Sequence, residues 1–194
     1  MSRQNNTAER RLRFGTLDWR QSDWSQSYYP EDLPEEWQLG YYANELSAVL
    51  LEPEAWCDQG GQALAGWQDE THPGFRFYLL ADATVDVQAQ SRRAAALGDR
   101  LGGLLWPELP APAGTLAPMA ELPERVRGWG DAQGLRLALL DVAGLDLRQR
   151  RGLLDALAPR LDDARSTAVI LVAPGLTPAD AHELQTVAEL MGLA

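Results

Sequence analysis

Short apolar runs recur along this chain at roughly the thirty-residue spacing of strand–helix units. Each run is followed by a segment in which apolar residues return with helical spacing. We predict strands over residues 12–17, 48–51, 75–81, 104–106, 135–142 and 167–173. The last of these, TAVILVA, is apolar at almost every position, which is typical of a strand buried on both faces. The alternation indicates an α/β fold with a mainly parallel sheet.

Helices are expected between these strands. They are predicted after Pro34 and over residues 53–67, 87–101, 123–133 and 146–161, with a last helix that begins at Thr177. Asp146 with Gln149 resembles a capping box. Gly128 and Gly130 weaken the predicted helix 123–133, and Pro159 is expected to kink or shorten the helix that contains it.

The segment from residue 13 to residue 56 is unusually aromatic for a strand–loop–helix–strand unit. Its pattern is a Gly-Thr strand, two Trp residues, Tyr-Pro, Leu-Pro and Tyr-Tyr-Ala, and it resembles the opening of the YecE-like family, catalogued as domain of unknown function 72. The matching residues are Gly15, Thr16, Trp19, Trp24, Tyr29, Pro30, Leu33, Pro34, Tyr41, Tyr42 and Ala43. Asp18 stands where the family usually has Gly. The resemblance implies a TIM-barrel-like fold without an established activity.

A complete barrel of this type needs eight strand–helix units and usually about 250 residues, whereas this chain has 194 residues and about six units. The first five strands resemble those of the family in order, and the last strand resembles the family's last. We therefore predict a flexible arm at residues 1–11 and one truncated or distorted TIM-barrel-like domain at residues 12–194. With six strands, the first and last are expected to face an opening, which a homodimer or an obligate protein partner would cover.

Composition restricts the classes of partner. The net charge of −11 disfavours nucleic acid, because an acidic surface repels phosphates. One cysteine, Cys57, excludes an intramolecular disulfide and fits a reducing cytoplasm. No apolar run reaches the length of a membrane span, so no membrane is expected as a partner. No nucleotide- or cofactor-binding motif is present, so no cofactor and no metal are expected, while a small-molecule ligand stays open.

Candidate site residues follow the strands, because function in parallel barrels lies at the carboxyl ends. The predicted ligand-binding residues are Asp18, Trp19, Trp24, Tyr29, Glu52, Asp82 and Asp141. The alternative for the carboxylates, which we favour, is that they are solvated residues that cap the next helices. The alternative for the aromatic residues, also favoured, is that they pack the barrel mouth and the first helix.

Several polar residues of the family are replaced by aliphatic ones. The resemblance places Leu50 or Leu51 where the family has Glu, Leu80 where it has Lys, and Leu140 and Val142 near a Glu and an Arg. Such replacements indicate that the ancestral site has been filled with core. The leading hypothesis is a non-catalytic binding or interaction protein. The alternative is a metal-assisted hydrolase that uses Asp18, Glu52, Asp82 and Asp141, which would require these carboxylates to converge.

Overall fold

A computed structural model describes residues 11–21, 24–161 and 166–193 of the chain. The predicted arm lies outside these residues except for Arg11, which begins the first strand. None of the helices in the described part is long and apolar enough to cross a membrane.

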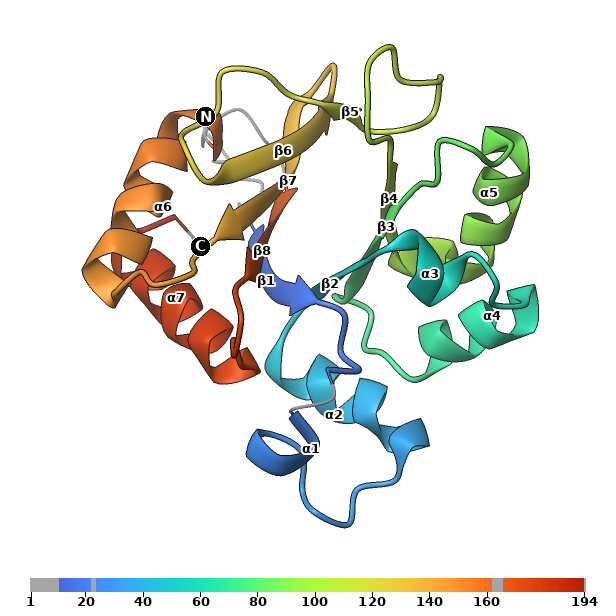
Figure 1. Ribbon diagram of the computed structural model, residues 1–194, viewed down its shortest axis with the longest axis horizontal. Coiled ribbons are helices and arrows are strands. Elements are labelled where there is room, and N and C mark those ends of the chain that lie inside the picture. The colour runs from blue at the N-terminus through green and yellow to red at the C-terminus, as the bar shows by residue number, and fades with distance from the viewer. Residues whose placement is uncertain (1–10, 22–23, 162–165, 194) are drawn as a thin grey trace, which may run out of the picture.

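The centre of the molecule is a mixed, mostly parallel sheet that curls into an almost closed barrel (Figure 1). Its eight strands lie in the order β4-β3-β2-β1-β8-β7-β6-β5. They are β1 (Arg11–Leu17), β2 (Ala48–Leu51), β3 (Arg76–Leu80), β4 (Leu101–Leu105), β5 (Ala117–Pro118), β6 (Val126–Asp131), β7 (Gly134–Asp141) and β8 (Ser166–Val172). The six predicted strands are confirmed with small changes of boundary, and the α/β prediction is confirmed with them.

The predicted helix 123–133 is wrong, because this segment contains β6. β6 pairs antiparallel with β7, and the two are joined by a tight turn in which the Asp131 carboxylate accepts a hydrogen bond from the Gln133 backbone N–H at 2.7 Å. The glycines that appeared to weaken a helix allow close packing in the hairpin. A Cβ at Gly130 would lie 2.4 Å from the Gly134 carbonyl oxygen. β5 and β6 thus add two strands that the hydrophobic pattern did not predict.

The predicted opening between the first and last strands is also wrong. β1 and β8 pair in parallel from Arg11–Ser166 to Thr16–Leu171. The ends of the sheet are β4 and β5, and they approach each other through a bridge between Leu105 and Leu116. The Leu116 N–H donates to the Leu104 carbonyl at 2.8 Å. The argument for a partner across a β1–β8 seam therefore loses its premise, because both edges of β8 are occupied by neighbouring strands.

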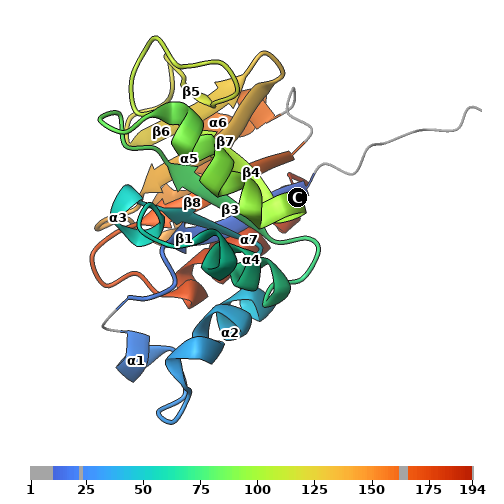
Figure 2. The same cartoon turned by 90° about the vertical axis from the view of Figure 1, so that its right-hand side faces the viewer.

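Helices flank the barrel on two sides, as the views in Figures 1 and 2 show. They are α1 (Trp24–Ser27), α2 (Gln38–Glu45), α3 (Pro53–Trp56), α4 (Gly61–Asp69), α5 (Val87–Ala94), α6 (Leu147–Leu161) and α7 (Pro178–Leu190), with 3₁₀ turns η1 (Glu35–Trp37) and η2 (Ala95–Arg100). The Asp146–Gln149 capping box is confirmed by two reciprocal bonds, of 2.9 and 2.8 Å. α6 continues through Pro159 to Leu161.

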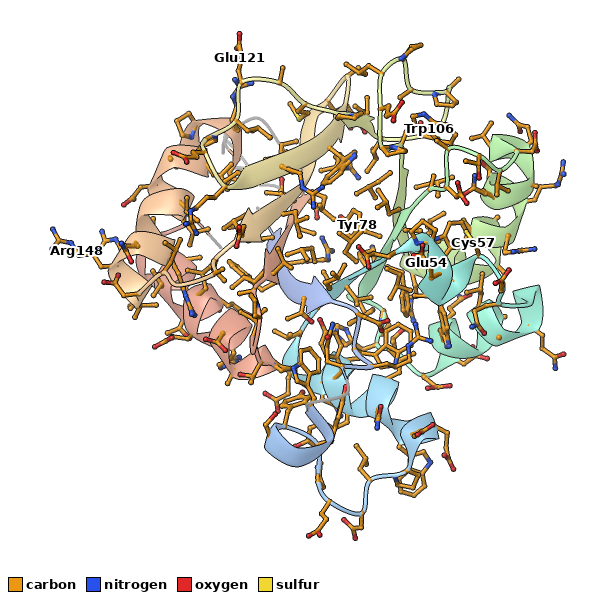
Figure 3. All side chains as sticks on the ribbon, in the orientation of Figure 1. Glu54, Cys57, Tyr78, Trp106, Glu121 and Arg148 are labelled. Carbon is orange, nitrogen blue, oxygen red and sulfur yellow. The ribbon has the colours of Figure 1, made fainter. Side chains whose placement is uncertain are left out.

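Buried apolar side chains form two clusters, one outside the ring of strands and one inside it. The larger cluster joins the outer faces of the strands to the helices. The smaller one, which we call the lumen cluster, contains no helix residue: its members are Ala48, Leu50, Tyr78, Leu105, Leu116, Trp129, Leu137, Leu139, Ala168 and Ile170. Figure 3 shows Tyr78 within the ring of strands. Leu50 is buried and Leu80 packs against this cluster, so aliphatic side chains fill the interior at two of the positions singled out above.

Candidate functional site

Asp18 directly follows β1, and its own loop engages its carboxylate. Its backbone has φ of 54°, and Oδ1 accepts hydrogen bonds from the backbone N–H groups of Trp19 at 2.7 Å and Arg20 at 3.1 Å. The Arg20 guanidinium binds both carboxylate oxygens at 3.1 Å and lies 4.5 Å from the centre of the Trp19 ring. Asp18 therefore organises the β1 loop through both of its carboxylate oxygens.

The other strand-end carboxylates either bond within their own loops or are exposed. The Thr84 hydroxyl and backbone N–H donate to Asp82 and hold its pKa below the usual range. Asp141 accepts from the Ala143 N–H at 3.0 Å, and Glu52 is exposed. Within the described ranges, no three His, Cys, Asp or Glu side chains are grouped so that they could hold a metal ion. The geometric condition set for the hydrolase hypothesis is not met by these residues.

The aromatic candidates are buried. Trp19, Trp24 and Tyr29 are 3%, 1% and 6% exposed, which confirms the expected burial of Trp19. The Tyr29 hydroxyl donates to the Trp19 carbonyl at 2.6 Å, and the Trp24 indole N–H donates to the Leu176 carbonyl at 2.8 Å. The first bond lies within the β1 loop, and the second fastens that loop to the loop after β8. The three aromatic side chains pack the barrel mouth, and their burial leaves a ligand little of their surface to contact.

The open space lies beside these loops, at the carboxyl ends of β7 and β8. A cavity of about 660 Å³, which we call the mouth hollow, is lined by Arg125, Val126, Arg127, Leu139, Asp141, Ala143, Val172, Ala173 and Pro174. A narrower space of about 160 Å³ shares Val172, Ala173 and Pro174 with it and includes Trp24. A third, of about 460 Å³, contains Asp18 and Glu52 and shares Leu17 and Gln21 with the second. The structure thus places the predicted residues Asp141, Trp24, Asp18 and Glu52 along one rim, without bringing them into one cluster.

Arg125 and Arg127 are the residues of this rim that sequence reasoning missed. A helix over residues 123–133, as predicted, would not bring either arginine to the ends of the strands. In the hairpin, Arg127 pairs with Leu139 and both line the mouth hollow. The signals that could have identified the hairpin are the turn sequence Asp-Ala-Gln-Gly and the largely apolar strand that follows it at once.

Arg125 has a strained backbone. Its φ is 67°, a left-handed value that a long side chain seldom adopts. Its carbonyl accepts from the Asp141 N–H at 2.9 Å, and its guanidinium donates to the Ala143 carbonyl at 2.9 Å. Asp18 and Arg125 are two of the three non-glycine residues with positive φ in the described chain, and both lie on the rim. Strain of this kind collects at functional sites and is a reason to examine this rim.

Comparison with known proteins supports the same architecture. A solved structure of a DUF72 family protein from Thermotoga maritima MSB8 superposes with a TM-score of 0.58 over 92% of this chain and 99% of that chain, at 13% sequence identity, which shows a shared fold. No curated protein sequence matches this chain. The family described as protein of unknown function DUF72 matches residues 13–139, which is more than half of the chain. The chain therefore belongs to the DUF72 family.

Proposed function

We propose that this protein is a non-catalytic binding module of the DUF72 family, and that its ligand occupies the mouth hollow. The observation that carries the proposal is the lining of that hollow. It contains two arginines, one carboxylate and otherwise apolar side chains, with no His, Cys, Ser or second carboxylate among its lining residues. Such a set binds and orients a ligand but lacks the paired groups of acid–base or nucleophilic catalysis.

The position and size of the hollow support the same function. Parallel barrels use the carboxyl ends of their strands for ligands, and ligand cavities are typically about 300–1,000 Å³. Beneath the hollow, the side chains of the lumen cluster fill the interior of the barrel. A ligand would therefore rest on the top of a filled barrel, with Leu139 and Val172 beneath it.

Soaking crystals of the protein with a panel of neutral, anionic and cationic fragments tests this proposal. Bound fragments are expected to collect in the mouth hollow, where apolar floor and polar rim meet. Matched soaks of a Val172→Trp variant, which places an indole in the hollow, should lose these fragments while retaining any that bind elsewhere. Fragments confined to other surfaces, such as the cleft between Tyr28 and His182, would contradict the proposal.

Divalent cations provide the contrast with the hydrolase hypothesis. We expect millimolar magnesium or manganese to leave the melting temperature unchanged within about 1 °C, since a ligand raises stability only by binding the native state. Differential scanning fluorimetry at constant ionic strength, with calcium and added sodium chloride as controls, makes the measurement. A saturable rise specific to magnesium or manganese, abolished in Asp141→Asn, would favour metal-dependent chemistry instead.

A further inference from the structure

We propose that the mouth hollow binds the oxyanion group of a small organic phosphate or carboxylate, with Arg127 as its main partner and Arg125 beside it. This inference rests on the proposed function and assigns the chemical class of the ligand. We expect an organic anion to bind more tightly than a bare inorganic ion, because the hollow also has an apolar floor that only the organic part can contact.

Arg127 lines the hollow, and its guanidinium has no carboxylate partner among the residues that the structure describes. Its guanidinium lies 5.9 Å from the centre of the Trp129 ring, which belongs to the lumen cluster, so the charge lies beside the barrel interior. The ion pairs found in the described part of the chain involve other arginines, and neither Arg125 nor Arg127 has a carboxylate within 4.0 Å there. A planar guanidinium with five N–H donors matches a phosphate or carboxylate in two-point geometry.

Arg125 is held in place before a ligand arrives. One of its terminal nitrogens donates to the Ala143 carbonyl, and its backbone is bonded to the end of β7. Among the described residues, no other bond engages the guanidinium, so its remaining N–H groups could bind an anion with little loss of side-chain freedom. The left-handed backbone at Arg125 fits this arrangement, because it is retained despite its conformational cost.

Asp141 and the apolar floor restrict which anions fit. Asp141 lines the same hollow and repels an anion at its own position, which favours the arginine side and leaves a carboxylate oxygen to accept from a donor on the ligand. Leu139 and Val172 offer a surface for an apolar body. The chain as a whole carries a net charge of −11, so attraction of an anion to this place must come from the local arginines.

Titration of the isotope-labelled full chain, followed by amide NMR signals, tests the inference with three probes: phenyl phosphate, benzyl alcohol and inorganic phosphate. Phenyl phosphate is expected to shift the signals of Arg127, Leu139 and Ala173, with affinity on the order of millimolar for so small a ligand. Arg127→Ala should weaken it about tenfold or more, and Arg127→Lys less, since Lys keeps the charge without the two-point geometry. Arg148→Ala is the matched control, because Arg148 projects outward from α6 (Figure 3) and is exposed.

Each outcome decides a different part. Benzyl alcohol that binds the hollow as tightly as phenyl phosphate, with no effect of Arg127→Ala, would overturn the oxyanion assignment and leave the proposed function standing. Inorganic phosphate that binds as tightly as phenyl phosphate would overturn the contribution of the apolar floor. Hollow signals that none of the probes shifts would overturn this inference, and the fragment soaks would then decide the proposed function separately. If Arg127→Ala and Arg148→Ala weakened the binding of phenyl phosphate equally, the effect would come from the overall charge of the protein, and the role of Arg127 would be overturned.

Discussion

Gly15→Ala is expected to cost at least about 4 kcal/mol of stability, enough to leave much of the protein insoluble or unfolded. Gly15 is buried in β1 between β2 and β8. A Cβ there would lie 1.9 Å from the Ala48 carbonyl oxygen and 2.5 Å from the Ala48 carbonyl carbon. Both are backbone atoms of the strand that pairs with Gly15, so relief requires the two strands to separate. Soluble yield and urea denaturation followed by circular dichroism measure the effect.

Gly152→Ala supplies the control with the same chemical change. Gly152 lies in α6, and a Cβ there would meet nothing within 4 Å. Alanine should stabilise this helix by roughly 0.5–1 kcal/mol, because glycine loses more backbone entropy on folding. If the free energy of unfolding of Gly15→Ala lay within about 1 kcal/mol of that of the unaltered protein, the close approach of β1 and β2 at Gly15 would be contradicted.

Trp24→Ala is expected to cost about 3–5 kcal/mol, as large aromatic truncations in cores do. Trp24 is 1% exposed, and its ring stacks on Tyr42 with centres 6.2 Å apart. The change also leaves the Leu176 carbonyl without its indole donor, at the junction between the β1 loop and the loop after β8. Chemical denaturation followed by circular dichroism avoids the loss of the fluorescence signal. The result separates a packing role from the ligand-binding role predicted from the sequence.

Two further variants make this comparison specific. Trp37→Ala removes a tryptophan that is 64% exposed and should change stability by less than about 0.5 kcal/mol. Trp24→Phe keeps an aromatic ring but loses the bond to Leu176, and about 1–3 kcal/mol is expected for the unsatisfied carbonyl. A cost for Trp24→Ala as small as that for Trp37→Ala would refute the packing role and return Trp24 to the candidate ligand contacts.

The local sequence pattern was sufficient to predict an element where its burial or its capping depends on residues of that element alone. The run Ala48–Leu51 is apolar at every position and forms β2 with the predicted bounds. Thr177 is the N-cap of α7 as predicted, because its backbone N–H and its hydroxyl both donate to the carboxylate of Asp180, a residue within the same turn. The aromatic opening identified the family, since its residues hold the β1 loop through contacts made mostly within the same unit.

The sequence by itself determined the α/β class, the positions of the strands that make up the parallel part of the sheet, most helix starts and the family. Only the tertiary structure decided that residues 126–131 form a strand, that β1 meets β8, and that Arg125 and Arg127 line a hollow with Asp141. The reason is that a glycine has no side chain and so adds nothing to the hydrophobic pattern of its segment. Gly128 and Gly130 fit a weak helix or a closely packed hairpin equally well until the opposite backbone is known. Sheet closure likewise depends on hydrogen bonds between segments far apart in the chain, which local periodicity does not encode.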